Sequence, residues 1–361
     1  MDVGVFIPIG NNGWIASANS PQYKPTFDLN RAIVEKAETY GFDFALSMIK
    51  LHGYGGPTEY WDYNLESFTL MAALAAVTKR IKLFASVAVL TLPPAMVARM
   101  AVTIDSIAPG RFGVNIVSGW QKAEYDQMGL WPGDEYFGYR YDYSTEYVAV
   151  MRELWETGRS DFKGKHFTMN DCHLLPKPSQ PITVVSAGQS DRGMKFVADY
   201  CDYNFVASFE DNNPKAVATT IERLKKATSG VDRKIGALVL LAVIADETDA
   251  KAEAKLKHYN AGADVEALAW MSGQSQIDVK ASKESTAALL SKARETAKAS
   301  YLQTFCGSYA KVAAYLDEIA EIDGVAGVML TFDDFLVGMD KFGEHIQPLM
   351  KSRARSSVRA D

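Results

Sequence analysis

Short apolar runs recur along the whole chain, and longer segments between them repeat apolar residues at helical spacing. The runs predict buried strands, because a strand covered on both faces is apolar throughout, and the longer segments predict amphipathic helices. The predicted strands are 3–9, 43–49, 81–89, 112–117, 182–186, 203–207, 235–245 and 325–332. The predicted helices are 29–40, 65–78, 94–108, 141–155, 192–200, 214–228 and 309–319, with a short C-terminal helix near 342–347.

Strands that alternate with helices require parallel pairing, and eight of them favour closure into a (β/α)8 TIM barrel. The alternative is a doubly wound open sheet. It calls for a Gly-x-Gly-x-x-Gly turn after the first strand, a spacing that residues 10–13 do not have.

Two segments are longer than a barrel needs and are predicted as insertions at its C-terminal mouth. Residues 50–64 are rich in glycine and aromatic residues, which suits a loop over a ligand. Residues 246–300 are polar and helix-prone, which suits a lid or an oligomer contact. Neither a repeat nor a linker is recognisable, so residues 1–361 are expected to form one domain.

Composition narrows the classes of function. The 361-residue chain is 48% hydrophobic with a formal net charge of -6 and no long Lys/Arg run, which argues against a nucleic-acid partner. The first residues lack a basic leader, and the apolar run 237–245 is too short to span a bilayer, so no membrane association and a cytoplasmic location are expected. Three cysteines and five scattered histidines give no metal-like spacing, so no metal is expected.

The stretch 110–120 carries the most informative polar residue. Asn115 lies in the middle of a predicted buried strand, where an unpaired amide costs roughly 1 to 3 kcal/mol. It either pairs with a backbone group in the core or points at a ligand, with Trp120 as an apolar wall beside it. The spacing of the residues alone does not decide between these two interpretations.

Polar residues at the other strand ends are further candidates, because barrel active sites lie at the carboxyl ends of the strands. Lys50 follows the second strand and Ser86 lies within the third. The turn 188–191 opens a helix, where Ser190 could help hold a phosphate together with Arg140, or could simply cap the helix. Glu59 and Asp62 form a possible carboxylate pair for a hydrolase, but a mobile aromatic loop favours solvation.

The segment 105–113, Asp-Ser-Ile-Ala-Pro-Gly-Arg-Phe-Gly, resembles the signature of the luciferase-like flavin monooxygenases, which are (β/α)8 barrels. Within that family, further segments resemble the two-component pyrimidine monooxygenases. They are 5–14, 42–51, 64–68, 91–94, 119–133, 140–143 and 330–335. The resemblance covers nearly the whole chain and is weakest over 276–304.

The resemblance implies an enzyme that uses reduced FMN and O2, with the FMN reduced by a separate NADH-dependent flavin reductase. It implies ring opening of uracil or thymine between N3 and C4, giving a ureidoacrylate or its peracid. The residues that it places at FMN are Ile49, Lys50, Asn115, Glu124, Arg140, Tyr141 and Ser190.

The catalytic candidates are Asn115 and Ser86, where the resemblance gives threonine as the more usual residue at the second position. Asn115 could donate a hydrogen bond to the reacting centre. Leu46 and Trp120 are expected to wall a dry substrate pocket.

Two rival functions remain beside this one. A related enzyme that oxidises a sulfonate or sulfone would need further arginines at the pocket, and only Arg140 is a candidate. A barrel that binds flavin without turnover is the second rival. A homo-oligomer is expected.

Overall fold

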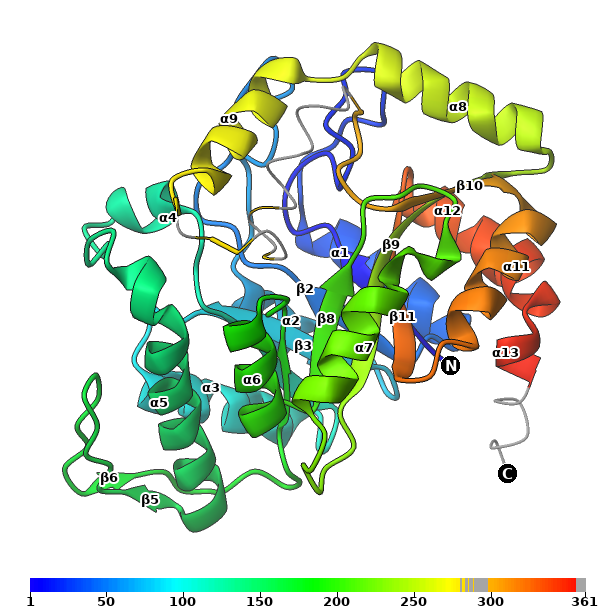
Figure 1. The fold of residues 1–361 in the computed structure, drawn as a ribbon. Helices are drawn as coiled ribbons and strands as arrows, with labels where there is room; N and C mark the ends of the chain where they lie inside the picture. Colours follow the sequence, from blue (N-terminus) through cyan, green and yellow to red (C-terminus); the bar gives the residue numbers. More distant parts are fainter. Residues whose placement is uncertain (280, 283–284, 286–287, 289–297, 355–361) are drawn as a thin grey trace.

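A closed ring of parallel strands forms the centre of the computed structural model, which describes residues 1–279, 281–282, 285, 288 and 298–354 (Figure 1). The sheet runs in the order β10-β9-β11-β1-β2-β3-β4-β7-β8, and the pairing of β8 with β9 closes the ring, with β10 outside it. The ring strands are β1 (Asp2–Ile7), β2 (Phe44–Ser47), β3 (Lys82–Ala88), β4 (Phe112–Val117), β7 (Thr183–Ser186), β8 (Tyr203–Ala207), β9 (Gly236–Asp246) and β11 (Val325–Phe332). The predicted (β/α)8 barrel and its strands are confirmed.

Two glycines allow large side chains to fill the barrel interior. A Cβ on Gly4 would lie 2.2 Å from the Phe44 ring, and a Cβ on Gly113 would lie 2.5 Å from the Phe84 ring. The phenylalanine rings therefore occupy the space that side chains at these positions would need. The barrel interior is therefore a packed core rather than an open channel.

Helices surround the ring, and all of them except α12 were predicted from the periodicity. They are α1 (Phe27–Thr39), α2 (Ser67–Val77), α3 (Pro94–Ile107), α5 (Tyr136–Thr157), α6 (Asp191–Tyr200), α7 (Ala218–Ala227) after the 3-10 turn η1 (Pro214–Val217), α11 (Tyr309–Ala320) and α12 (Phe335–Lys341). Helix α3 begins at Pro94 as predicted. The prediction started α5 too late, because the fully buried Tyr136 lies in the polar-looking stretch ahead of it.

Several elements were not predicted. Strand β10 (Thr304–Ser308) extends the sheet beside β9, and β5 (Arg159–Ser160) pairs antiparallel with β6 (Cys172–His173). Short helix α4 (Lys122–Asp126) follows β4. The short C-terminal helix predicted near 342–347 is present as the π-helix η3 (Phe342–Ile346), and η4 (Gln347–Leu349) and α13 (Lys351–Ala354) follow it.

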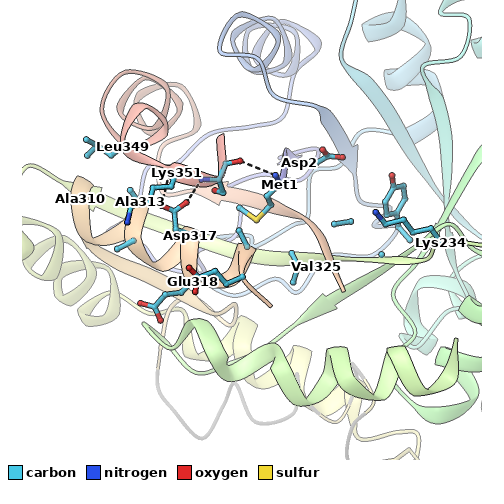
Figure 2. Close-up of a pocket in the computed structure, with 17 residues that line it drawn as sticks. Met1, Asp2, Lys234, Ala310, Ala313, Asp317, Glu318, Val325, Leu349 and Lys351 are labelled. Carbon is cyan, nitrogen blue, oxygen red and sulfur yellow. Dashed lines mark hydrogen bonds between the residues drawn. The ribbon is translucent and has the colours of Figure 1, made fainter. Parts of the chain in front are cut away.

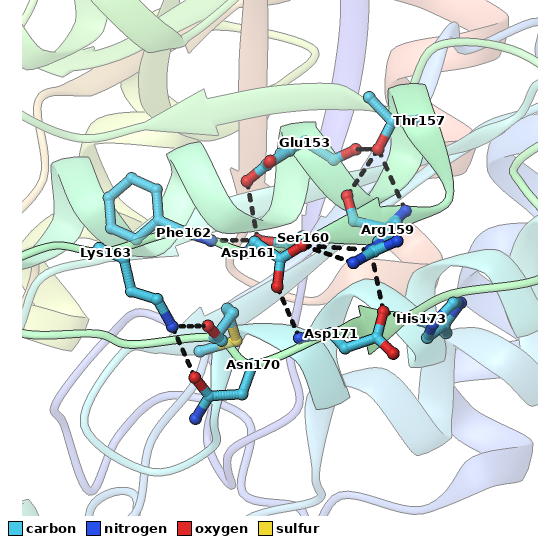
Figure 3. Close-up of polar contacts among 11 residues, drawn as sticks. Glu153, Thr157, Arg159, Ser160, Asp161, Phe162, Lys163, Asn170, Asp171 and His173 are labelled. Carbon is cyan, nitrogen blue, oxygen red and sulfur yellow. Dashed lines mark hydrogen bonds and ion pairs between the residues drawn. The ribbon is translucent and has the colours of Figure 1, made fainter.

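The β5–β6 hairpin lies at the end of α5 (Figure 1), and polar side chains hold it together (Figure 3). Arg159 pairs with Asp161 at 2.9 Å and with Asp171 at 2.9 Å, and all three side chains are more than half exposed. Ser160 is buried and donates its hydroxyl to Glu153 of α5 at 2.7 Å. The hairpin is thus a solvated feature remote from the barrel mouth.

The two insertions lie against each other above the barrel. Helices α8 (Asp249–Ala261) and α9 (Val265–Ser275) come from the second insertion and lie on the side opposite the two chain ends (Figure 1). The buried Asp264 carboxylate accepts from Thr58 N at 2.9 Å and from Thr58 Oγ1 at 2.6 Å, and the rings of His52 and Trp270 stack at 5.0 Å. Residues 280, 283–284, 286–287 and 289–297 of the predicted insertion lie outside the described residues.

Within the described part of the chain, no helix combines the length and apolar character needed to cross a membrane.

Candidate active site

A cavity of about 210 Å³ opens at the carboxyl ends of the strands, beneath the two insertions. Its walls are mostly aromatic and its floor carries polar side chains. The aromatic residues are Phe6, Trp14, Tyr54, Trp61, Trp120, Tyr141, Phe205, Phe209 and Tyr301, and the polar side chains include Lys50, Ser86, Asn115, Glu124, Arg140 and Ser186. A mostly apolar hollow with a few convergent polar groups is typical of a small-molecule site.

Asn115 and Ser86 are neighbours because β3 and β4 pair with Ser86 opposite Asn115. Asn115 Nδ2 donates to Ser86 Oγ at 2.8 Å, and Ser86 Oγ donates to the Ser47 carbonyl at 2.5 Å. Asn115 is 5% exposed, and its Oδ1 has no hydrogen-bond partner among the described residues. One end of the amide is therefore paired in the core, through the Ser86 side chain rather than through the backbone group that was predicted, and Oδ1 at the other end has no partner among the described residues.

Lys50 is a buried cation beside the cavity. Its Nζ lies 2.9 Å from Glu124 Oε1 and donates to Gln121 Oε1 at 2.5 Å and to the Tyr54 hydroxyl at 3.2 Å. Burial lowers the pKa of Lys50, and the Glu124 carboxylate opposes that shift. Breaking a buried ion pair by removing one partner costs about 3–5 kcal/mol. The Lys50–Glu124 pair therefore holds these two side chains in place in the cavity lining.

Arg140 enters the cavity from α5. Its guanidinium lies 3.4 Å from an oxygen of Asp278 and donates to the Gly119 carbonyl at 3.4 Å, while Nε has no partner among the residues described. These contacts are long for charge-assisted hydrogen bonds. A buried guanidinium with an unpaired donor is suited to an anionic ligand group.

Ser190 caps α6 by accepting a hydrogen bond from Gly193 N at 3.2 Å, which confirms the prediction that it is a helix cap. It does not line the cavity, although Gly188, two residues earlier in the same turn, does. A Cβ on Gly193 would lie 2.7 Å from both Gly188 Cα and the Tyr141 hydroxyl. The two glycines, both buried, thus let the turn and the first turn of α6 pack closely together beside Tyr141.

The remaining predicted site residues divide into two groups. Ile49 and Trp120 line the cavity. Leu46 does not: it is 1% exposed, lies between Phe6 and Phe84 in the strand register, and belongs to the layer beneath the floor.

The carboxylate pair considered for a hydrolase is solvent-facing. Glu59 and Asp62 are both exposed and bond to their own loop, through the Tyr63 hydroxyl and Gly55 N respectively. Asp334 caps α12 by accepting from Val337 N at 3.0 Å. No group of three or more His, Cys, Asp or Glu side chains in the described ranges could hold a metal ion.

Sequence reasoning missed Gln121, Tyr54 and Asp278. Gln121 and Tyr54 contact Lys50, and Asp278 contacts Arg140. Burial of Tyr54 raises the pKa of its hydroxyl well above 10, with a further contribution from Glu124. Each lies in a loop or insertion, so no periodicity could point to it.

A larger hollow of about 1070 Å³ lies at the opposite, amino-terminal end of the barrel (Figure 2). It is lined by the starts of β1, β9 and β11 and by one face of α11, with Asp2, Lys234, Asp317 and Glu318 among its charged residues. Asp317 uses both carboxylate oxygens to bond Lys351 N and Ser352 N. Position and chemistry favour the smaller cavity as the active site, because barrel catalysis takes place at the carboxyl ends.

The fold and the cavity define a class of (β/α)8 enzymes. The chain belongs to the luciferase-like monooxygenase family, whose model matches residues 1–325. More particularly, it is similar over nearly its full length to curated proteins called pyrimidine monooxygenase RutA. The protein from Bradyrhizobium sp. is 63% identical over 354 residues, covering 98% of each chain, and that from Escherichia coli (strain ATCC 8739) is 59% identical over 358 residues, covering 99% of this chain and 98% of its own.

Solved structures share the fold at lower identity. Riboflavin lyase (RcaE) superposes with a TM-score of 0.83 at 18% identity, covering 100% of this chain and 92% of its own. The long-chain alkane monooxygenase LadA superposes with a TM-score of 0.81 at 19% identity, covering 100% and 93%.

Proposed function

We propose that this protein is a flavin-dependent pyrimidine monooxygenase that uses O2 to open uracil or thymine between N3 and C4, giving a ureidoacrylate or its peracid. The observation that carries the proposal is the buried Ser86–Asn115 pair on the floor of an aromatic cavity. Relatives 59–63% identical over the full length carry the pyrimidine monooxygenase name, which supports the substrate class.

The residues present fit FMN. Arg140 has an unpaired buried donor, Asn115 an unpaired buried acceptor, and Lys50 is a second buried cation near the same cavity. We assign FMN binding to Ile49, Lys50, Asn115, Glu124, Arg140, Tyr141 and Ser190. Reduced FMN, when bound, supplies the electrons that activate O2.

The phosphate end of FMN fits the edge where Arg140 and Ser190 lie. Arg140 can offer paired N–H donors to phosphate oxygens. The hydroxyl hydrogen of Ser190 can donate to a phosphate while its oxygen caps α6, and the helix N-terminus favours the negative charge.

The aromatic walls serve to exclude water. Trp120 closes one side of the cavity, and the stacked Phe6 and Trp14 rings, 4.1 Å apart, close another. A dry cavity strengthens the polar interactions of the floor and suppresses side reactions with water. Trp120 is assigned to the substrate wall, with Leu46 supporting the floor from below.

Two partner assignments complete the proposal. A separate NADH-dependent flavin reductase supplies the reduced FMN, and the protein forms a homo-oligomer.

The test is product analysis by mass spectrometry. The protein is mixed with uracil, FMN, NADH, a flavin reductase and O2. A ring-opened ureidoacrylate that disappears when FMN or O2 is omitted supports the proposal. Unchanged uracil with FMN shown to be bound rejects it, and would turn attention to a sulfonate or sulfone substrate or to a flavin carrier without turnover.

A further inference from the structure

The hydrogen-bond chain behind the cavity has a fixed direction. Ser86 Oγ lies 2.5 Å from the Ser47 carbonyl oxygen, which can only accept. The hydroxyl hydrogen of Ser86 is therefore committed to Ser47. What remains on Ser86 Oγ is lone-pair density, which can accept but cannot donate.

This direction determines how the Asn115 amide is turned. With its Nδ2 toward Ser86, the 2.8 Å contact is a hydrogen bond. With the amide reversed, two oxygens without a hydrogen between them would face each other at that distance, which is repulsive. The Asn115 carbonyl oxygen is thus forced to the other side, where it is buried and has no partner in the described part of the chain.

Ser67 anchors the chain from behind. Its Oγ accepts from Ser86 N at 2.8 Å and shares a hydrogen bond with the Ser47 hydroxyl. Ser67 is the first residue of α2 and is fully buried, so it ties the helix to β2 and β3 at the level of the cavity floor. The Ser47 carbonyl and Ser86 are thereby held in register.

We propose that Ser86 is a positioning residue that locks Asn115 as a hydrogen-bond acceptor, so that the cavity selects a planar heterocycle that donates an N–H to Asn115 Oδ1. This inference rests on the proposed function. Two ligands of that function carry such a group: reduced flavin has a hydrogen at N5, whereas oxidised flavin has a lone pair there, and uracil has two ring N–H groups. The inference adds an accepting role for Oδ1 to the sequence-based expectation that Asn115 donates to the reacting centre, because Nδ2 has a second hydrogen besides the one given to Ser86.

The first arm of the test measures the affinities for reduced FMN, under anaerobic conditions, and for oxidised FMN. Ser86→Ala removes the lock, and Ser86→Thr keeps the hydroxyl. The preference for reduced FMN is expected to fall about three- to tenfold in Ser86→Ala, the effect of one hydrogen bond, and to be retained in Ser86→Thr. A tenfold change corresponds to about 30 mV in the midpoint potential of the bound two-electron couple.

Ser160→Ala is the matched control. Ser160 is a buried serine of the remote hairpin, and its hydroxyl donates a hydrogen bond to Glu153 of α5 (Figure 3). It should leave the ratio of the two affinities unchanged. A general loss of stability would lower both affinities together, whereas loss of the lock changes their ratio.

The second arm measures binding of uracil, 1-methyluracil and 3-methyluracil to the FMN-loaded protein. If the lock serves the substrate, one methylated form binds more weakly than uracil, and Ser86→Ala narrows that difference. Unchanged ratios in both arms would overturn the inference while leaving a ring-opening activity intact. Failure of FMN to bind in either redox state would overturn both the inference and the proposed function.

Discussion

At the scale of single residues, polar side chains in segments predicted to be buried were the most useful guide to the site. Asn115 could be singled out because an amide in an apolar strand needs a partner, and the structure gives it one on one side only. The orientation of the Asn115 amide could not be predicted, because it depends on the Ser47 carbonyl, whose position is set by strand register. Asp278, the partner of Arg140, was equally unpredictable, since it lies in the insertion.

Asn115→Ala is expected to reduce ring opening by about 100-fold or more while FMN still binds. The reason is that a preorganised polar group beside the reacting atoms is typically worth two to three orders of magnitude in rate. Steady-state turnover and flavin fluorescence titration measure the two quantities. Asn30→Ala, which removes a buried amide on α1 outside the cavity, should retain full turnover per folded molecule; normal turnover by Asn115→Ala refutes the assignment.

Arg140→Ala is expected to weaken FMN binding by about 10- to 100-fold, because it removes a buried charge-assisted donor. Turnover should recover at high FMN concentration, since Arg140 is assigned to binding rather than to the reacting centre. Arg192→Ala serves as the control: Arg192 lies on the neighbouring α6, is 55% exposed and pairs with Asp142. Unaltered FMN affinity in Arg140→Ala would contradict the assignment.

At the scale of elements, apolar periodicity predicted all eight ring strands, with their ends within two residues of those observed. It failed where an element is short or atypical. Strand β10 contains Gly307 and follows the weakly patterned insertion, and α12 begins directly after β11, so their signals merge with those of their neighbours. A proline in the first turn was more informative, as Pro94 at the start of α3 illustrates.

Glu38 joins α1 to the start of β3, and its role depends on pH. Its carboxylate accepts from Lys79 N at 2.9 Å, Arg80 N at 2.5 Å and Ile81 N at 2.9 Å. Burial alone would raise the pKa of Glu38, but these backbone hydrogen bonds outweigh it and lower the pKa below its usual 4.5. The stabilisation is therefore fully present above about pH 4.5 and is lost as the pH falls through the lowered pKa.

Glu38→Gln is accordingly expected to lower the free energy of unfolding by roughly 1–3 kcal/mol near pH 7, with the difference from the unchanged protein narrowing below about pH 4.5. Denaturant unfolding at several pH values measures this. Glu35→Gln on the same helix removes only an exposed ion pair with Arg31 and should change stability by less than about 0.5 kcal/mol. A pH-independent difference for Glu38→Gln would be inconsistent with this role.

At the scale of the whole molecule, the cavity is lined in part by two insertions that are distant in sequence and adjacent in space. The sequence predicted both segments and placed them at the barrel mouth, but not the contacts between them. Asp264 of the second insertion caps α9 through Ala267 N at 3.1 Å and binds Thr58 of the first. One buried carboxylate thus holds the roof of the cavity together.

Asp264→Ala should leave buried donors of Thr58 unpaired and destabilise the roof by about 1–3 kcal/mol. Hydrogen exchange is expected to become faster over residues 54–60 and over α9, with the ring strands unaffected. Asp142→Ala, which removes an exposed ion pair with Arg192, should leave exchange in both insertions unchanged. Equal protection of the roof in Asp264→Ala and the unchanged protein would show that the insertions are held by other contacts.

The central claim is that this barrel inserts oxygen from O2 into a pyrimidine. The most direct measurement supplies uracil, FMN, NADH and a flavin reductase under ¹⁸O2 in ordinary water, then repeats the reaction under ordinary O2 in H2¹⁸O, with mass analysis of the ring-opened product. The account predicts that ¹⁸O enters the product from ¹⁸O2. A ring-opened product labelled only from water would identify a hydrolase and contradict the account.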